Sequence, residues 1–171
     1  MSDAKSKPRF TIRPAVPDDA ETLVNLIREL AIYEKLEHFA KASAADLQKN
    51  LFGPRPYAEA LIAEVDSVPV GMALFFHTFS TFRGQPGIHL EDVFVQPEHR
   101  GLGIGKVLLG TLARIARDRG CGRLEWAVLD WNKSAIGFYK SLGGAPLDEW
   151  TVFRIADEPL ERLTRYAPES S

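Results

Sequence analysis

Three alternating glycines, Gly101, Gly103 and Gly105, constrain the fold of this chain more than any other feature. They follow an apolar stretch at 88–95 that is typical of a strand and precede helical apolar spacing that ends near Gly120. Each glycine weakens a helix by about 1 kcal/mol, so a tight turn alone accounts poorly for all three. Bare backbone N–H groups at the positive end of a helix bind anions. The sequence therefore favours a strand, an anion-binding turn and a helix over a simple turn.

The glycine segment matches neither of two common phosphate-binding motifs. A P-loop has Ser or Thr after its lysine, but Lys106 is followed by Val107, and the leading glycine is missing. A dinucleotide fingerprint needs a small residue at the position that Lys106 occupies. These differences leave a pyrophosphate cradle of another kind.

The segments around the glycines predict a mixed sheet with helices packed on it, an α/β or α+β domain. We expect two of its strands to form an antiparallel hairpin through 66–69. The expected strands are 10–14, 57–65, 70–79, 88–95, 124–129 and 151–155. The expected helices run from a cap at Asp18 to about Glu34, from a cap at Ser43 to Gly53, from the glycines to Gly120, from Lys133 to Leu142 after a cap at Asn132, and onward from Pro159.

Length and composition indicate one globular domain. The chain has 171 residues, of which 45% are hydrophobic and 26% charged. We expect a flexible tail over 1–8, one domain over 9–166 and a frayed end over 167–171. A net charge of −2 gives no reason to expect a nucleic-acid partner. Without a secretory signal or an apolar run of about 20 residues, the sequence indicates a cytoplasmic protein with no membrane contact.

The cysteine and histidine content argues against a metal site or a disulfide. Cys121 is the single cysteine, which excludes an intramolecular disulfide and a cysteine-rich zinc site. The four histidines, His38, His77, His89 and His99, lack the spacing of paired metal ligands. We therefore expect no metal, and we interpret the histidines as surface or structural residues.

Residues 96–105, Q-P-E-H-R-G-L-G-I-G, resemble the acetyl-CoA motif of the GCN5-related N-acetyltransferases (GNAT). The motif is Arg/Gln-x-x-Gly-x-Gly/Ala, and Arg100, Gly103 and Gly105 match it. A second element of that family fits at Asn132, Ala135, Tyr139 and Gly143. The resemblance implies a mostly antiparallel sheet with acetyl-CoA bound at a splayed strand pair. The cofactor-binding residues that it implies are Phe94, Val95, Arg100, Gly101, Leu102, Gly103, Ile104, Gly105, Lys106, Asn132 and Tyr139.

Three further segments, 27–36, 90–95 and 127–132, are similar to the diamine acetyltransferase subfamily, and the similarity spans about 10–163. Within that subfamily, 79–84, 119–121 and 127–132 look nearer to the thialysine Nε-acetyltransferase branch than to the spermidine/spermine branch. Polyamine enzymes have Asp and Trp where this chain has Ser80 and Phe82. The resemblance thus implies a thialysine-like, lysine-like or diamine acceptor. The alternatives are a spermidine/spermine enzyme, a protein lysine or N-terminal acetyltransferase, and a non-catalytic CoA-binding module.

Acetyl transfer to an amine requires removal of a proton, because a lysine-like ammonium has a pKa near 10.4. Glu91 matches the family position of the general base, although it could instead only bind the ammonium or pair with a basic neighbour. Tyr139 matches the position of the acid that protonates the CoA thiolate, with a packed core tyrosine as the alternative. Cys121 lacks the signature of an acetyl-carrying nucleophile, so we expect direct transfer in a ternary complex.

The resemblance also implies which residues recognise the amine. The substrate-binding residues are Tyr33, Glu34, Ser80, Phe82, Glu91 and Asp92. Neighbouring residues of a strand point to opposite faces, so Glu91 and Asp92 can line one pocket only with a bulge or across a subunit interface. Members of the subfamily have such a bulge and form homodimers, and the same is expected here.

Overall fold

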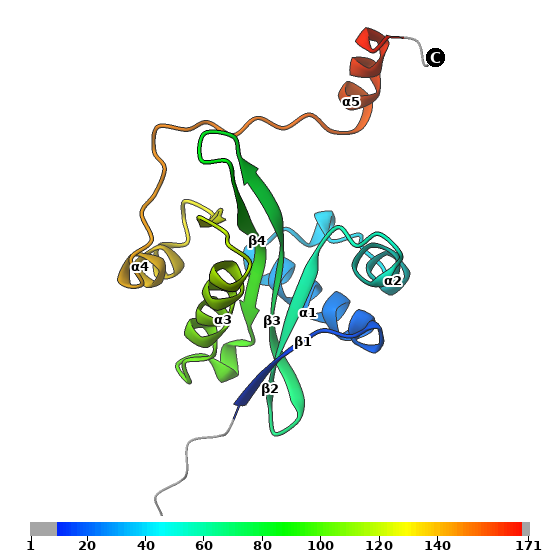
Figure 1. Cartoon of the computed structure of the whole chain (residues 1–171). Helices are drawn as coiled ribbons and strands as arrows, with labels where there is room; N and C mark the ends of the chain where they lie inside the picture. Colours follow the sequence, from blue (N-terminus) through cyan, green and yellow to red (C-terminus); the bar gives the residue numbers. More distant parts are fainter. Residues whose placement is uncertain (1–9, 169–171) are drawn as a thin grey trace, which may run out of the picture. The chain divides into compact units, whose positions relative to one another are not determined.

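The computed structural model describes residues 10–168 (Figure 1). Contacts divide the chain into two compact units, one through Ala127 and one from Val128, and each is described by itself. The tail expected over 1–8 lies outside the described residues, as do the last three residues of the end expected to fray. Residues 167 and 168 belong to no helix or strand.

The first unit contains a five-stranded sheet in the order β1-β2-β3-β4-β5. The first four strands are antiparallel, and β5 pairs with β4 in parallel, which confirms the expected mixed, mostly antiparallel sheet. The strands are β1 Phe10–Pro14, β2 Glu59–Val65, β3 Val68–Ser80, β4 Gln85–Val95 and β5 Leu124–Trp126.

The parallel pair of strands separates early. β5 pairs with β4 only from Ile88↔Leu124 to Leu90↔Trp126, whereas β4 continues to Val95. The strand expected over 124–129 is therefore too long by three residues, because β5 ends where its pairing ends. Residues 91–95 of β4 therefore have no parallel partner in β5, as the splayed strand pair implied by the resemblance would require.

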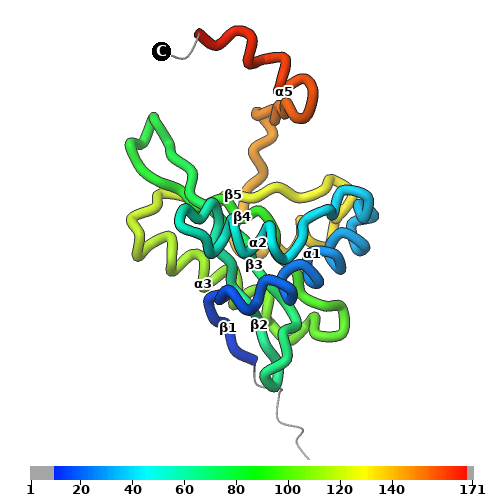
Figure 2. The backbone as a smooth tube through the Cα atoms, turned by 90° about the vertical axis from the view of Figure 1, so that its right-hand side faces the viewer, coloured from blue at the N-terminus to red at the C-terminus, as the bar shows by residue number. Residues whose placement is uncertain are grey.

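Both hairpin turns are tighter than expected. Asp66 and Ser67 have φ values of 50° and 65°, so these two residues alone reverse the chain between β2 and β3. The strands expected over 70–79 and 88–95 left 80–87 as their connection, but this connection spans only 81–84, since Gly84 has φ 62° and pairing resumes at Ser80↔Gln85. Figure 2 shows the β3–β4 hairpin, in green, projecting beyond the helices of its unit.

Helices cover both faces of the sheet. Figure 1 shows α1 (Ala20–Glu34) and α2 (Ala44–Phe52) on one face and α3 (Ile104–Asp118) on the other. Residues of α1 and α2 pack against alternating residues of the sheet, because side chains of a strand alternate between its faces. The fully buried members of this core include Leu23 of α1 with Ile62 and Met72 of the sheet. Leu108 and Leu112 of α3 are buried as completely.

The helix caps follow the sequence with one correction. Ser43 and Asp46 form the expected capping box, with Asp46 N donating to Ser43 Oγ over 3.2 Å. The cap expected at Asp18 is wrong, because Pro17 starts a short 3₁₀ turn and α1 begins only after Asp19. Asp19 accepts a hydrogen bond from Val16 N at 2.7 Å and pairs with Arg13 at 2.6 Å.

The second unit contains α4 (Lys133–Ser141) and α5 (Asp157–Leu163). Asn132 caps α4 as expected, since its Oδ1 accepts from Ala135 N at 3.1 Å. The strand expected over 151–155 is wrong: the segment is in no strand, and Val152 and Phe153 are 89% and 90% exposed. β-branched and aromatic residues favour a strand, but a strand forms only where it has a hydrogen-bonded neighbour. The last helix begins at Asp157 rather than at Pro159.

Candidate active site

The glycine turn, residues 100–105, follows a short 3₁₀ turn (Pro97–His99) after β4 and leads into the first turn of α3. Gly101 and Gly103 have φ values of 81° and 90°, which residues with a side chain rarely adopt. A Cβ at either position would meet nothing within 4 Å, so the approach to the turn is open. Gly103 is the N-cap of α3 and provides no side-chain cap to its backbone N–H groups. An open, uncapped and positive helix end fits the phosphate groups of CoA.

The other expected cofactor residues differ in what they can contribute. Phe94 and Ile104 are 4% and 1% exposed, so their side chains belong to the core and only their backbone could face a ligand. Val95 and Leu102 are half-buried, whereas Lys106 is exposed in the first turn of α3.

Arg100 is held toward α1. Its Nε donates to the carbonyl oxygen of Val95 at 2.9 Å. Its guanidinium carbon lies 4.5 Å from the centre of the Tyr33 ring and 5.8 Å from that of Phe94. Both rings are within the range of a cation–π interaction. The side chain expected to meet a phosphate thus contacts the element that carries the expected substrate-binding residues.

A bulge in β4 resolves the conflict between Glu91 and Asp92. Leu74 of β3 pairs with Asp92 and the next residue, Phe75, pairs with Leu90, so Glu91 is an extra residue without a partner across the strand pair. A bulge places two residues opposite one and allows both side chains to lie on one face. The expected bulge is confirmed.

Glu34, Glu91 and Asp92 form the acidic cluster of the site. Burial raises the pKa of Asp92 to about 6, with further contributions from the negative charges of Glu91 and Glu34. Burial also raises the pKa of Glu34. Glu91 is exposed to solvent. Because the charges of Glu34 and Glu91 act on Asp92, the three carboxylates together provide a place for a positive charge.

The end of α1 adds to this negative potential. Tyr33 and Glu34 are the last two residues of α1, and Lys35 ends the helix with φ 60°. The carbonyl groups at a helix C-terminus carry partial negative charge and favour a cation. A protonated amine is the kind of ligand that this combination of helix end and carboxylates would bind.

His89 is a neighbour of Glu91 that we interpreted from the sequence only as surface or structural. Its Nε2 lies 3.8 Å from Glu91 Oε2, and its ring packs against Phe76 at a tilt, with the centroids 5.1 Å apart. The signal available in the sequence was its position two residues before Glu91, since alternate residues of a strand share a face.

Ser80 and Phe82 lie away from the acidic cluster. Ser80 is buried, and its Oγ accepts a hydrogen bond from Arg83 N at 3.3 Å, which fixes the β3–β4 turn. Phe82 is 99% exposed. Ser80 follows Leu74, the partner of Asp92, by six residues, a distance of about 20 Å along the strand. Within one chain, Ser80 and Phe82 therefore do not lie beside Glu91 and Asp92.

Asn132 and Tyr139 belong to the second unit. Asn132 is 9% exposed, and its side-chain oxygen is engaged in capping α4. Tyr139 is half-buried on α4, with its ring 5.5 Å from that of Phe138. The two residues lie at the start and in the last turn of α4, in the order that the resemblance implied.

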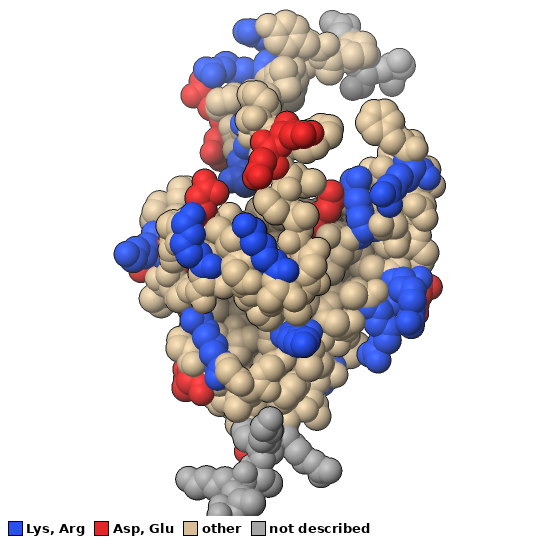
Figure 3. Space-filling model, turned by 90° about the vertical axis from the view of Figure 1, so that its left-hand side faces the viewer, with Lys and Arg blue, Asp and Glu red and all other residues tan. Residues whose placement is uncertain are grey.

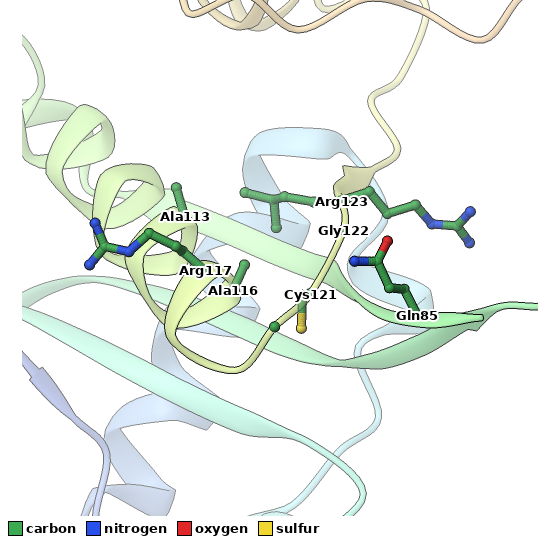
Figure 4. A pocket seen from close by; sticks show the side chains of 9 residues that line it. Gln85, Ala113, Ala116, Arg117, Cys121, Gly122 and Arg123 are labelled. Atoms are coloured by element: carbon green, nitrogen blue, oxygen red, sulfur yellow. The ribbon is translucent and has the colours of Figure 1, made fainter. Parts of the chain in front are cut away.

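A separate shallow pocket of 380 Å³ lies at the C-terminal end of α3 (Figure 4). Arg117, Cys121 and Arg123 contribute to its wall. α3 is about 22 Å long, so this pocket is far from the glycine turn at the other end of the helix. We therefore do not assign it to the active site.

Three further observations concern surface charge, metal ligands and membrane-spanning helices among the described residues. Lys and Arg side chains are spread over the face seen in Figure 3, with other residues between them. Within 10–168, no group of three or more His, Cys, Asp or Glu residues is placed to hold a metal ion. The described helices include none with the length and apolar character needed to cross a membrane.

Comparison with known proteins gives the family. Residues 22–144 match the acetyltransferase (GNAT) family. A thialysine N-epsilon-acetyltransferase from Bos taurus is 42% identical over 163 residues, covering 89% of this chain and 95% of that protein. A spermidine/spermine N(1)-acetyltransferase-like protein from Homo sapiens is 34% identical, covering 88% of this chain and 23% of that longer protein. An integron cassette protein from the mobile metagenome of V. cholerae has a similar structure, with a TM-score of 0.77, 28% identity and coverage of 91% and 98% of the two chains.

The fold, the glycine turn and these relatives together define an N-acetyltransferase. The chain belongs to the GNAT family, which uses acetyl-CoA as the acetyl donor.

Proposed function

We propose that the protein transfers an acetyl group from acetyl-CoA to a primary amine of a small molecule, by direct transfer in a ternary complex. The observation that carries the proposal is the position of the acidic cluster. Glu34, Glu91 and Asp92 gather where α1 ends and β4 bulges, and Arg100 of the glycine turn contacts the last turn of α1. The site for a cationic acceptor therefore lies beside the site for an anionic donor.

The acidic cluster holds the amine and receives its proton. Asp92 and Glu34 are the more buried carboxylates, and they bind the ammonium by charge and hydrogen bonding. Glu91 is exposed and is displaced from the strand pairing by the bulge, so it can pass the proton on to solvent. In this proposal Glu91 accepts the proton, directly or through a water, and leaves a neutral amine.

The donor side positions the thioester and completes the transfer. Acetyl-CoA supplies an acetyl group with a thiol as its leaving group. The backbone of the glycine turn binds the phosphate groups, and the family motifs imply that Lys106 and Asn132 contact the rest of the cofactor. Tyr139 donates its hydroxyl proton to the departing thiolate, and the proton that the nitrogen releases as the amide forms restores the hydroxyl.

Among small amines, we favour thialysine, lysine-like amino acids or diamines over spermidine and spermine. The Bos taurus relative is named for thialysine, and it is more similar to this chain than the spermidine/spermine-like relative is. Ser80 also lacks the carboxylate that the polyamine enzymes have at that position. Removing one carboxylate weakens the binding of a long polycation more than that of a short amine.

We also propose a cytoplasmic homodimer. Within the described chain, Trp150, Val152 and Phe153 are at least 74% exposed, and apolar residues exposed in such a row indicate an interface. A single cysteine without a disulfide partner fits a reducing compartment. Sedimentation would test the homodimer, since a monomer at micromolar concentration would contradict it.

The experiment that tests the function is the release of CoA thiol from acetyl-CoA by the purified protein. Thialysine, lysine, putrescine, spermidine and spermine would be compared, each with wild type and with Glu91→Gln. Preference for thialysine or lysine, with a flattened basic limb of the pH–rate profile in Glu91→Gln, supports the proposal. Strong turnover of spermidine would support acetyl transfer to a small amine and would contradict the proposed acceptor preference.

Two other results would contradict the small-molecule acceptor or the catalytic activity itself. Transfer of labelled acetyl groups from acetyl-CoA into macromolecules of a cell lysate, without turnover of small amines, would indicate a protein acetyltransferase. Tight binding of CoA with no release on any substrate would indicate a non-catalytic module.

A further inference from the structure

We propose that Arg100 is a positioning residue, which fastens the last turn of α1 to the glycine turn and thereby holds Tyr33 and Glu34 at the acceptor site. This inference rests on the proposed function, because it assigns the acceptor to that end of α1. It differs from the phosphate-binding role that the motif implies for Arg100. The contacts that carry it are the stacking of the guanidinium on Tyr33 at 4.5 Å and the hydrogen bond from Nε to Val95 O at 2.9 Å.

These two contacts together restrain the guanidinium from two sides. The hydrogen bond ties its Nε to the end of β4, and the ring of Tyr33 lies within stacking distance of the same group. A planar, delocalised cation can donate from its edge and stack with its face, which an ammonium cannot do. Arg100 therefore joins two elements that are 67 residues apart in the chain.

A second contact supports the same connection one helical turn earlier. Gln96 Nε2 donates to both carboxylate oxygens of Glu29, at 3.1 Å and 3.0 Å. Glu29 and Tyr33 are four residues apart on α1, so they share one face of the helix. The segment after β4 thus contacts this face at two successive turns, through Gln96 and then through Arg100.

The electrostatics of the acidic cluster agree with a positioning role for Arg100. The pKa of Asp92 is raised by burial and by the carboxylates of Glu91 and Glu34. A guanidinium paired with Asp92 would instead lower that pKa. The Arg100 cation is held by an aromatic ring and a carbonyl oxygen, and the acidic cluster keeps its negative charge for the amine of the substrate.

Steady-state kinetics of Arg100→Lys separates the two roles. Lysine keeps the positive charge and loses the stacked plane, so we expect the KM for the amine to rise about 5-fold to 10-fold, with kcat and the KM for acetyl-CoA within about 2-fold of wild type. Tyr33→Leu should raise the amine KM as well, and the double variant should add little to the larger single effect. Arg114→Lys is the matched control, the same change at an exposed position of α3.

A higher KM for acetyl-CoA with an unchanged amine KM would overturn the proposal, because Arg100 would then act on the donor. Additive effects of Arg100→Lys and Tyr33→Leu would also overturn it, since they would show that the two side chains act independently.

Amide hydrogen exchange tests the contact without any turnover. In the last turn of α1, Leu36 N donates to Ala31 O at 2.8 Å, and Lys35 N donates to Ile32 O at 3.1 Å. We expect these two amides to exchange several-fold faster in Arg100→Lys than in wild type or in Arg114→Lys. Unchanged exchange would overturn the inference. If wild type acetylates no amine but exchange is faster in Arg100→Lys, the proposed function fails and the positioning role stands.

Discussion

The glycine turn and the acidic cluster lie at neighbouring ends of two helices, and they are built in opposite ways. The turn presents backbone N–H groups at the N-terminus of α3, and the residues that shape it have no side chain. The acidic cluster lies at the C-terminus of α1 and consists of carboxylate side chains. The first end is positive and the second is negative, so the two helices alone already separate a place for phosphate from a place for ammonium.

This difference indicates how the two halves of the site should respond to substitution and to pH. The glycine turn is the donor half, and the acidic cluster is the acceptor half. Recognition by backbone depends on φ values such as the 90° of Gly103, and the charge of a backbone N–H group does not vary with pH. Recognition by carboxylates depends on their protonation, which varies with pH around the raised pKa of Asp92. The donor half should therefore be sensitive to any Cβ in the turn, and the acceptor half to charge and pH.

The largest effect is expected at Tyr139, the side chain of the donor half to which we assign chemistry. Tyr139→Phe removes the proton for the CoA thiolate and should lower kcat on the order of 10²-fold, with the affinity for acetyl-CoA nearly unchanged. Single-turnover kinetics and CoA binding measure the two quantities. Tyr57→Phe, at an exposed tyrosine of the first unit, is the control. An undiminished kcat would remove Tyr139 from the acid role and leave the donor half with backbone recognition alone.

The next effect tests the backbone of the turn directly. Gly103→Ala forces a side chain into a φ of 90°, at a strain of about 1–3 kcal/mol, and places a methyl group where the phosphate approaches. We expect the Kd for CoA, measured by calorimetry, to rise about 30-fold with the amine KM little changed. Gly110→Ala is the matched control, since Gly110 lies inside α3, has ordinary φ and has open space for a Cβ. Equal effects of the two substitutions would contradict a special role of the turn.

The sequence predicted the donor half better than the acceptor half. A glycine pattern between a strand and a helix is a local signal, and the positive φ values of Gly101 and Gly103 confirm the turn that it predicted. The bulge at Glu91 depends on how β3 pairs with β4, which residue spacing alone does not contain, and it was expected only through the resemblance. The contact between Arg100 and Tyr33 depends on tertiary packing in the same way, and the residue spacing did not indicate it.

The errors in secondary structure have the same origin. Residues 151–155 have the composition of a strand, yet they form none, because composition does not specify a neighbouring strand. β5 stops at Trp126 because pairing with β4 stops at Leu90, although the apolar residues continue to Leu129. By contrast, the capping box at Ser43 was correctly predicted, since all its atoms lie within four consecutive residues.

The acceptor half is tested by Asp92→Asn. Because the pKa of Asp92 is raised to about 6, its carboxylate is neutral below that pH and charged above it. In wild type we expect the amine KM to fall as the pH rises through about 6. In Asp92→Asn the amine KM at pH 8 should be about 10-fold higher than in wild type. It should also no longer fall as the pH rises through about 6. Asp118→Asn, at an exposed position on α3, is the control.

The stability of Asp92→Asn distinguishes lost binding from unfolding. A raised pKa means that the folded chain holds this proton more tightly than the unfolded chain does. The contribution of Asp92 to stability is therefore present below its ordinary pKa of 3.8 and is lost as the pH rises through about 6. At pH 8 the Tm of Asp92→Asn should equal or exceed that of wild type. A Tm well below wild type, or a KM step that persists in the variant, would assign the pH dependence to another group.

The smallest effect is expected at His89, the neighbour of Glu91 in the acceptor half. Its Nε2 lies 3.8 Å from Glu91 Oε2, and Glu125 lies opposite it in β5. A protonated imidazole would compete with the amine for Glu91. Solvent-exposed ion pairs are weak, and we expect His89→Gln to lower the amine KM only about 2-fold at pH 6 and not at pH 8.5.

The same measurement separates charge from packing at His89. The imidazole also stacks on Phe76, and loss of that contact would act at every pH. A change of equal size at pH 6 and pH 8.5 would therefore show that His89 only packs against the sheet. His38→Gln, at an exposed histidine whose ring lies 4.0 Å from that of Phe39, controls for the loss of a stacked imidazole elsewhere. An effect confined to low pH would show that protonation limits amine binding at two side chains of the acceptor half, Asp92 and His89, and at none in the glycine turn.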